Sequence, residues 1–347
     1  MHDEPIGRMH RLQRFQGSNY DVTNRCNLRC EGCLFFAGDD YLDHDDDPDL
    51  VAWDRLFADE AARGVNFAYL AGAEPALAPD ILRIAYKHIP DGVIFTNGTI
   101  KIPQDIGYRL HISIWGGSET AAELRGADSN GKAFRNFAQD PRAVFVMTLN
   151  PLNLHEAEEV VLECRDRGAR ITFSMYTPTA NYLEQLGREE GDVIRDDFFR
   201  FSSKERNLNF DRDSLAKARA IAGELAARYP ETVLFSEAYF DWLCSADPLY
   251  DLDEHGIAKN CGNRLSHDWR HYAADRTESD GKCCSPNLDC GECRAYAMSL
   301  GSYIKQRPDK LSSGGREKWY AAFSVWCDLF LKPDIQTAVG KSAYSLS

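Results

Sequence analysis

The sequence predicts an α/β fold built on a parallel sheet, with a small cysteine-rich domain and a terminal helix after it. Three observations predict this fold. Short apolar runs alternate with helical patterns over roughly two thirds of the 347 residues. Six of the eleven cysteines fall between residues 244 and 293, where periodicity is weak. The last helical pattern, REKWYAAFSVWCDLFL (316–331), closes the chain and is predicted to pack on the rest.

The predicted strands are short runs rich in apolar and β-branched residues. In order they are SNYDVT (18–23), NFAYLA (66–71), GVIFT (92–96), LHISIW (110–115), AVFVMTL (143–149) and RITFSMY (170–176). A further strand-like run, TVLFSEAYF, covers 232–240. Because helical segments separate the first six, we expect these strands to be parallel. Ligands of such sheets bind where the strands end.

The predicted helices lie between these runs. Four of them cover 49–64, 78–88, 131–140 and 153–169, and an alanine-rich one covers 213–229. The first has Trp53, Leu56, Phe57 and Ala61 on one face and ends at Gly64, a common helix stop. The fourth begins with Asn153 and Glu156, spaced as in a capping box.

The amino-acid composition disfavours some classes of function. The formal net charge is −14, which disfavours a nucleic-acid partner because phosphate binding depends on Lys and Arg. We see no apolar run of membrane-spanning length and no signal peptide, so we expect a cytoplasmic protein without a membrane partner. Thiols stay reduced there, and the cysteines are therefore expected to be ligands or buried thiols.

The stretch DVTNRCNLRCEGCLFF (21–36) carries the main functional signal. Its spacing C-x3-C-x2-C places Cys26, Cys30 and Cys33 on one tight loop directly after the first predicted strand. Three thiolates can bind three irons of a [4Fe–4S] cube and leave the fourth iron open to another molecule. A structural zinc site with a fourth ligand elsewhere is the alternative.

Further motifs favour the cluster. LAGAEPAL (70–77) follows the second strand, FTNGT (95–99) the third, and HISIWGG (111–117) the fourth. Together with the cysteine loop, they make residues 18 to about 236 similar to the radical S-adenosylmethionine (radical SAM) family. This resemblance implies a partial (β/α)6 TIM-like barrel in which the cluster reduces S-adenosylmethionine. The resulting 5′-deoxyadenosyl radical takes a hydrogen atom from the substrate.

The resemblance also implies cofactor-binding residues. Gly72 and Glu74 match the family's Gly-Gly-Glu-Pro loop for the cofactor's amino group, and Ala73 replaces its second glycine. The substitution is tolerable if the φ angle of Ala73 stays negative. Asn97, Ser113, Arg125 and Asn150 are the other candidates for binding S-adenosylmethionine.

The sequence departs from the family's pattern directly before the third cysteine. Gly32 stands where many relatives have an aromatic residue, so Leu34 and Phe35 are the nearest candidates for covering the adenine.

The segment from 260 to 293 contains a second cysteine group. It resembles the SPASM and twitch extensions of radical SAM enzymes, which hold an auxiliary [4Fe–4S] cluster. The implied ligands are Cys261, Cys283, Cys290 and Cys293. Cys284 is an alternative to Cys283, and a four-cysteine zinc site is the alternative to the cluster.

The remaining cysteines have other predicted roles. Cys164 and Cys327 fall on apolar helix faces and are expected to be core thiols. Cys244 follows the last strand-like run, which would place it at the mouth of the barrel. There it could return a hydrogen atom to a substrate radical, as in radical SAM epimerases. The histidines, including His111 and His271, have no metal-site spacing and are expected to be exposed or in the core.

These features predict residues 1–240 as the radical SAM barrel, 241–312 as the auxiliary domain and 313–347 as the terminal helix. About 17 residues precede the first strand, too few for a cobalamin-binding or leader-peptide domain. We therefore expect an oxidoreductase that acts on a small polar metabolite in natural-product biosynthesis. An acidic run at 38–49 would favour an amine-bearing one. Epimerisation with Cys244, peptide modification and a non-catalytic zinc protein are the alternatives. A flavodoxin- or ferredoxin-type donor would supply the electron.

Overall fold

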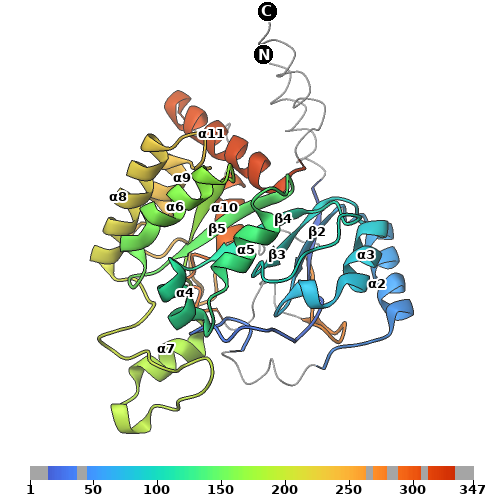
Figure 1. The fold of residues 1–347 in the computed structure, drawn as a ribbon, viewed down its shortest axis with the longest axis horizontal. Helices are drawn as coiled ribbons and strands as arrows, with labels where there is room; N and C mark the ends of the chain where they lie inside the picture. The colour runs from blue at the N-terminus through green and yellow to red at the C-terminus, as the bar shows by residue number, and fades with distance from the viewer. Residues whose placement is uncertain (1–14, 37–44, 263–268, 280–287, 306–311, 333–347) are drawn as a thin grey trace, which may run out of the picture.

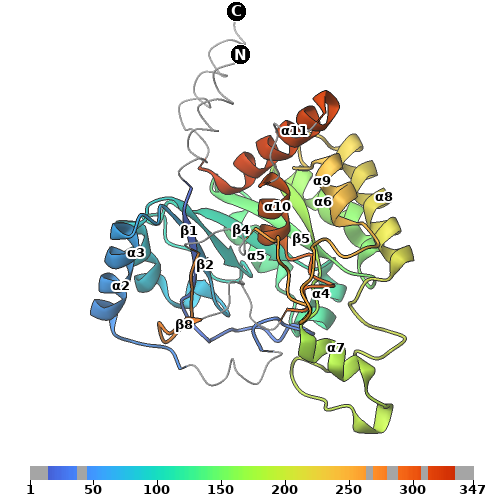
Figure 2. The same cartoon turned by 180° about the vertical axis from the view of Figure 1, so that it is seen from behind.

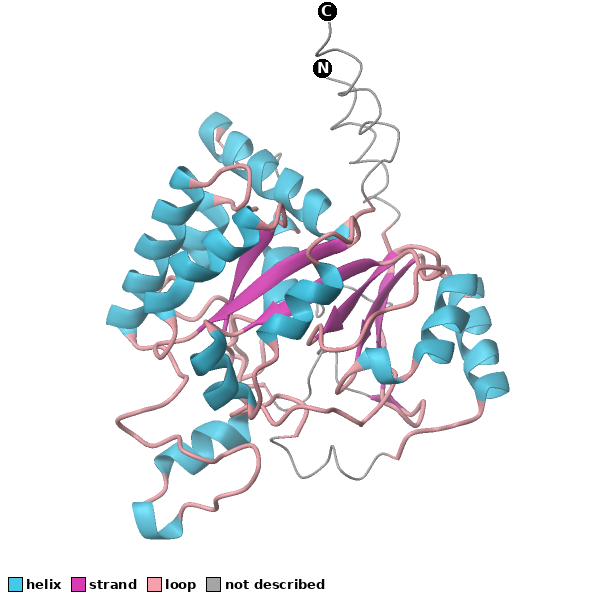
Figure 3. Ribbon diagram, viewed as in Figure 1, coloured by secondary structure: helices cyan, strands magenta, loops and turns pink. Residues whose placement is uncertain are grey.

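The computed structural model describes residues 15–36, 45–262, 269–279, 288–305 and 312–332. Helices surround one central sheet (Figure 3). The sheet has eight strands in the order β6-β5-β4-β3-β2-β1-β7-β8. Within the described ranges, no helix combines the length and the apolar character needed to cross a membrane.

The first six strands run parallel, as predicted. They are β1 (Gly17–Asp21), β2 (Phe67–Ala71), β3 (Gly92–Thr96), β4 (Arg109–Ile114), β5 (Ala143–Leu149) and β6 (Ile171–Met175). The predicted α/β fold with a TIM-like partial barrel is confirmed. Most side chains of these strands are buried on both faces, as the continuous apolar runs require.

The helices cover both faces of this sheet. Their bounds are α2 (Leu50–Ala62), α3 (Pro79–His88), α4 (Ser118–Arg125), α5 (Asn130–Phe137), α6 (Ala157–Asp166), α7 (Ala180–Gly187), α8 (Arg212–Arg228), α9 (Glu237–Leu243), α10 (Tyr296–Ile304) and α11 (Ser313–Phe330). Figures 1 and 2 show α5 in front of β4 and β5 on one face and α10 on the other. Cys164 on α6 and Cys327 on α11 are buried in the core, as predicted.

Two local predictions are wrong. The run at 232–240 is not a strand: Val233 makes one isolated bridge to Ile171, and α9 begins at Glu237. Ser236 favours the helix because its side chain accepts a hydrogen bond from the backbone N–H of Tyr239. Asn153 does not form a capping box, since its amide bonds the backbone of the preceding turn at Thr148 and Asn150.

The cysteine-rich segment adds the short strands β7 (His271–Tyr272) and β8 (Glu278–Ser279) to the edge of the sheet beside β1. The buried carboxylate of Glu60 joins β7 to the barrel, because the hydroxyls of Tyr20 and Tyr272 each donate to it at 3.0 Å. The two tyrosine rings also stack, with centroids 5.6 Å apart. His271 Nε2 lies 2.8 Å from the buried carboxylate of Asp21. These contacts fix the C-terminal segment on β1.

Helix α11 packs on the sheet at the start of β4. The guanidinium of Arg109 donates to the carbonyls of Asp328 (2.7 Å) and Leu329 (3.3 Å), and His111 Nε2 lies 2.9 Å from the Leu329 oxygen. The last carbonyls of a helix have no partner within the helix, so these β4 side chains satisfy them. The contacts also hold the His111 ring in a fixed orientation.

Candidate active site

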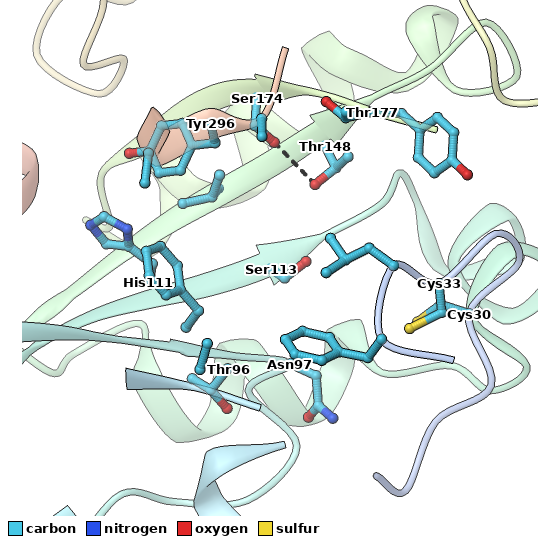
Figure 4. A pocket seen from close by; sticks show the side chains of 18 of the residues that line it. Cys30, Cys33, Thr96, Asn97, His111, Ser113, Thr148, Ser174, Thr177 and Tyr296 are labelled. Atoms are coloured by element: carbon cyan, nitrogen blue, oxygen red, sulfur yellow. Dashed lines mark hydrogen bonds between the residues drawn. The ribbon is translucent and has the colours of Figure 1, made fainter. Parts of the chain in front are cut away.

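A cavity of about 310 Å³ opens at the carboxyl ends of the strands. Residues from the cysteine loop, from β1 to β6 and from the start of α10 line it. Figure 4 shows Cys30 and Cys33 at one end of the cavity, with His111 and Tyr296 at the other. The cavity lies where a parallel sheet is expected to bind its ligands.

The three clustered cysteines lie together at this cavity. Cys26, Cys30 and Cys33 all line it. Burial raises the pKa values of Cys26 and Cys33, and the neighbouring Cys30 raises both further. Three thiols that close together suit the three-corner attachment of an iron–sulfur cube. Across the described ranges, no three His, Cys, Asp or Glu side chains are arranged to hold a single metal ion.

The cysteine loop is clamped by the irregular segment after α7. The buried carboxylate of Glu31 accepts hydrogen bonds from the backbone N–H groups of Arg200 (2.8 Å) and Ser202 (3.0 Å). Gly32 donates its N–H to the Phe198 carbonyl at 2.6 Å, and Phe36 stacks on the Phe198 ring. The sequence gives no signal for this clamp, because the segment 188–211 has no periodic pattern.

The acidic run also contributes to the loop. Asp46 accepts hydrogen bonds from the Thr23 hydroxyl (2.6 Å), the Asn24 backbone N–H (2.5 Å) and Arg25 (2.8 Å). Asp47 pairs with Arg276, and this contact lowers the pKa of Asp47 together with a backbone bond from Asp49. Asp46 therefore organises the chain just before Cys26, and Asp47 ties the acidic run to Arg276 after β7.

The surroundings of residue 32 explain why it is a glycine. Its φ angle is +58°, and a Cβ atom there would overlap the Tyr176 hydroxyl. That hydroxyl instead donates to the Gly32 carbonyl at 2.9 Å. Tyr176 lines the cavity beside Trp115, so the residues that directly follow β6 and β4 supply aromatic rings there. Leu34 and Phe35, the predicted adenine contacts, also line the cavity.

The loop after β2 places its backbone against the cysteine loop. Gly72 has a φ of +116°, and a Cβ there would lie 2.8 Å from the Thr23 carbonyl oxygen, so glycine is required. Ala73 donates its N–H to the same carbonyl at 2.8 Å. Its φ is not positive, which meets the condition for replacing the family's second glycine. Gly72 and Ala73 both line the cavity.

Glu74 lies behind the cavity wall and is fully buried. Its carboxylate accepts hydrogen bonds from Thr96 Oγ1 (2.6 Å), the Asn97 N–H (2.7 Å) and the Ala76 N–H (2.9 Å). Burial raises the pKa of Glu74, and these three donors oppose that effect. Glu74 thus joins the β2 loop to the end of β3 and positions Asn97, which lines the cavity with its amide 3.8 Å from Cys26 Sγ.

Arg125 supplies the cavity with a buried positive charge. It is 2% exposed, and its Nη1 donates to the Ser113 carbonyl (2.6 Å) and the Ser129 hydroxyl (3.1 Å). Within the described ranges, its Nε–H has no hydrogen-bond partner. A buried donor without a partner is costly, so this group suits an anionic ligand. Ser113 lines the cavity next to it.

The structure does not bring every predicted residue to this cavity. Asn150 is buried behind it. Cys244, at the end of α9, lines a separate pocket with Arg219 and Asp241. Burial raises the pKa of the Cys244 thiol to about 12.

The second cysteine group is described in part. Cys283 and its alternative Cys284 lie outside the described residues. Cys261 and Cys290 are half-buried and Cys293 is buried. Cys261 and Cys293 both approach the Tyr250 phenol closely enough to raise its pKa, after burial as the main cause. Two of the predicted ligands therefore converge on one tyrosine.

Several cavity residues were missed by sequence reasoning: Thr148, Ser174, Thr177, His111 and Tyr296. Thr148 and Ser174 bond each other at 3.0 Å across β5 and β6 (Figure 4). A polar residue inside an otherwise apolar strand is a signal that could have found Thr148, Ser174 and His111. Tyr296 has no such signal, because the segment before α10 is irregular.

Comparisons with known proteins were made in sequence and in structure. No family model matches the chain. A stretch of 196 residues is 26% identical to GTP 3′,8-cyclase of Sulfurovum sp. (strain NBC37-1), which is 50% of this chain and 58% of that protein. A stretch of 165 residues is 27% identical to the sporulation killing factor maturation protein SkfB of Bacillus subtilis (strain 168), which is 43% of this chain and 40% of that protein. The matches thus span about half the length of these relatives.

Solved structures share the fold. SuiB of Streptococcus suis bound to S-adenosylmethionine aligns with a TM-score of 0.53 at 14% identity, over 81% of this chain and 64% of that chain. Native anSMEcpe with bound AdoMet aligns with a TM-score of 0.52 at 12% identity, over 94% of this chain and 99% of that chain. The predicted architecture agrees with both.

Proposed function

We propose, from the confirmed resemblance of this chain to radical SAM enzymes, that it cleaves S-adenosylmethionine reductively and abstracts a hydrogen atom from a substrate in the described cavity. One observation carries this proposal. The three thiols of the C-x3-C-x2-C loop line the same cavity as the buried Arg125 and the loop at Gly72. A structural zinc site would have no need of a cavity beside it.

The residues fit the cofactors chemically. Cys26, Cys30 and Cys33 offer three thiolates to a [4Fe–4S] cluster, and the Nε–H of Arg125 offers a donor to a carboxylate. When bound, this pair of cofactors supplies a carbon radical that removes a hydrogen atom from a nearby C–H bond.

The chain itself has three tasks in this reaction. The loop at Gly72 and Ala73 approaches the cysteine loop closely enough to hold a ligand between them. Leu34 and Phe35 offer apolar surface for an adenine ring. The aromatic lining further along the cavity excludes water and unwanted hydrogen donors, and it orients the substrate.

We favour an oxidoreductase acting on a small metabolite, with a flavodoxin- or ferredoxin-type electron donor. A second candidate is peptide modification. It is supported by the name of SkfB, a maturation protein, and by SuiB, which was solved bound to the precursor peptide SuiA and aligns with a TM-score of 0.51 at 14% identity. We also propose residues 241–312 as an auxiliary-cluster domain with Cys261, Cys283, Cys290 and Cys293 as ligands. Epimerisation through Cys244 receives less support, because Cys244 lines another pocket.

Anaerobic purification tests the proposal. We expect about eight irons per chain, from two four-iron clusters, and formation of 5′-deoxyadenosine from S-adenosylmethionine under dithionite. Replacing Cys26, Cys30 and Cys33 by Ala should remove about four irons and the cleavage activity. The matched control is Cys164→Ala, which changes a buried core thiol on α6. A colourless protein with stoichiometric zinc, or full cleavage by the triple variant, would contradict the proposal.

Turnover in deuterated buffer separates the reaction types once a substrate is found. An epimer gains deuterium at carbon, whereas a dehydrogenated product does not. Cys244→Ala should abolish the first reaction and leave the second.

A further inference from the structure

We propose that the end of the cavity remote from the cysteine loop is a substrate subsite for an uncharged group with a hydrogen-bond donor, which His111 Nδ1 accepts. The inference rests on the proposed function, which places the cofactors at the cysteine end of the cavity. The opposite end is then assigned to the substrate. It goes further by naming the chemical class of the group and the atom that recognises it.

The tautomer of His111 follows from its contacts. The side chain is 2% exposed, and its Nε2 lies 2.9 Å from the Leu329 carbonyl oxygen. A carbonyl only accepts, so Nε2 carries the hydrogen. Burial lowers the pKa of His111 to about 3, so the ring is neutral and Nδ1 keeps its lone pair. This Nδ1 atom is buried and has no hydrogen-bond partner among the residues that the structure describes.

The surroundings of His111 are aromatic. The rings of Phe95 and Tyr296 lie with their centroids 5.3 and 5.5 Å from the imidazole, and all three residues line the cavity. The buried Tyr296 hydroxyl also lacks a hydrogen-bond partner in the described part of the chain. Figure 4 shows His111 and Tyr296 together at the end opposite Cys30 and Cys33. Two polar atoms that need partners therefore lie in an apolar environment.

Charge restricts the ligand further. Among the described residues that line the cavity, Arg125 is the sole Asp, Glu, Lys or Arg. Arg125 lies at the cysteine end, because its positive charge is close enough to Cys26 to lower the pKa of that thiol. Behind the lining, the charge of the Arg109 guanidinium acts on the His111 ring, and this guanidinium already donates to the carbonyls of Pro141, Asp328 and Leu329. An ammonium group beside His111 would therefore be desolvated near a like charge, and a carboxylate would be desolvated near a guanidinium that is already engaged; both are costly. The expectation of an amine-bearing substrate therefore finds no support in this lining. A phenol, an indole or an alcohol suits it.

The anaerobic protein with its clusters and S-adenosylmethionine is titrated with four probes of one shape. p-Cresol is neutral and has a donor, 4-methylanisole has no donor, tyramine is cationic and 4-hydroxyphenylacetate is anionic. We expect p-cresol to bind about tenfold tighter than the other three, since one hydrogen bond to a buried acceptor accounts for about a factor of ten. N-acetyltyrosinamide offers the same phenol on a peptide unit and tells whether a peptide can present it.

Two variants isolate the acceptor. His111→Phe keeps a ring of similar shape and removes the Nδ1 acceptor, while Arg109 still donates to the Leu329 carbonyl, so it should weaken p-cresol about tenfold and leave 4-methylanisole unchanged. His88→Phe is the control, since His88 at the end of α3 pairs with Asp54 of α2, away from the cavity. In the wild-type protein, the ¹⁵N resonance of His111 Nδ1 should shift with p-cresol and not with 4-methylanisole, which tests the contact without any variant.

Equal binding of p-cresol and 4-methylanisole, unchanged p-cresol binding in His111→Phe, or an unmoved Nδ1 resonance would each overturn the inference. Failure of the proposed function looks different, because the wild-type protein would then not form 5′-deoxyadenosine at all.

Discussion

Three buried polar atoms around the cavity have no hydrogen-bond partner within the described chain: Arg125 Nε, His111 Nδ1 and the Tyr296 hydroxyl. Leaving such an atom unpaired costs about 1–3 kcal/mol. Other buried polar groups, such as Glu74 with its three donors, are fully satisfied. The unpaired atoms therefore mark positions where a ligand is expected to complete the structure.

His111 should make the stability of the protein depend on pH. Its pKa is about 3 in the folded protein and 6.5 ordinarily, through burial and the nearby charge of Arg109. As pH falls below 6.5, the unfolded chain takes up a proton that the folded protein does not, so stability falls until pH reaches about 3. Between pH 7 and pH 5 the loss from this group is about 2 kcal/mol.

Urea unfolding of the wild-type protein and of His111→Gln at pH 7, 6 and 5 measures this loss. The difference between the two proteins should shrink as pH falls, because all other titrating groups are common to both. Parallel stability profiles would show that His111 is protonated as readily in the folded protein as in the unfolded chain.

Single residues were predictable where the chemistry is strict. The cysteine spacing and the requirement for glycine at Gly72 are readable, because no other residue type serves there. His111 was expected only to be exposed or in the core, since its neighbours Leu329 and Tyr296 are distant in sequence. The role of Gly32 likewise depends on Tyr176, 144 residues away.

At the scale of elements, the cysteine loop takes its shape from other segments. The segment at 196–202, an excursion after α7, holds it through Glu31, while Leu124 and Arg125 at the end of α4 accept backbone N–H groups from it. Figure 1 shows α7 projecting from the body of the protein beside α4. The geometry of the cysteine loop is thus controlled by a part of the chain that contributes no cysteine.

Glu31→Gln tests this clamp. The amide replaces one carboxylate oxygen by a donor that faces backbone N–H groups, so we expect the free energy of unfolding to fall by about 2–3 kcal/mol. Hydrogen exchange at Arg200 and Ser202 should accelerate. Glu123→Gln is the matched control, because Glu123 is exposed and pairs with Arg206, a contact of about 0–1 kcal/mol. Equal losses in the two variants would argue against the clamp.

The parallel strands and the longer helices were predictable from periodicity, whereas the short helices α4, α7, α9 and α10 were not predicted. The six parallel strands were expected from apolar runs, because both faces of such strands are buried. The run at 232–240 has the composition of a strand, but Ser236 caps a helix within it. Asn153 has the right spacing for a capping box, yet its side-chain amide forms hydrogen bonds with the backbone of Thr148 and Asn150 at the end of β5. In both cases the hydrogen bonds of one polar side chain decide the local structure.

At the scale of the whole molecule, the two ends of the described chain meet. Phe15 packs edge-on against Trp326 of α11, with ring centroids 5.5 Å apart, and Trp326 stacks on Phe330. Phe330 in turn contacts the His111 ring, at 4.9 Å. Helix α11 is therefore part of the barrel core and supports the cavity from behind.

Trp326→Ala should lower the free energy of unfolding by about 3–5 kcal/mol, because it removes a buried indole. Tyr320→Ala on the same helix is the control, since Tyr320 is 43% exposed and should cost little. Urea denaturation followed by circular dichroism measures both. Similar midpoints for the two variants would mean that α11 is not part of the cooperative core.

The pairing of β7 with β1 has a consequence for biosynthesis. Asp21 and His271 are 250 positions apart, so this edge of the first strand stays uncovered until almost the whole barrel has been translated. At about 5–20 residues per second, the ribosome needs roughly 12–50 s for that stretch. An open strand edge attracts other strands during this interval. Nascent chains should therefore depend on chaperones until the cysteine-rich segment emerges. Lower growth temperatures slow translation and should lengthen that dependence.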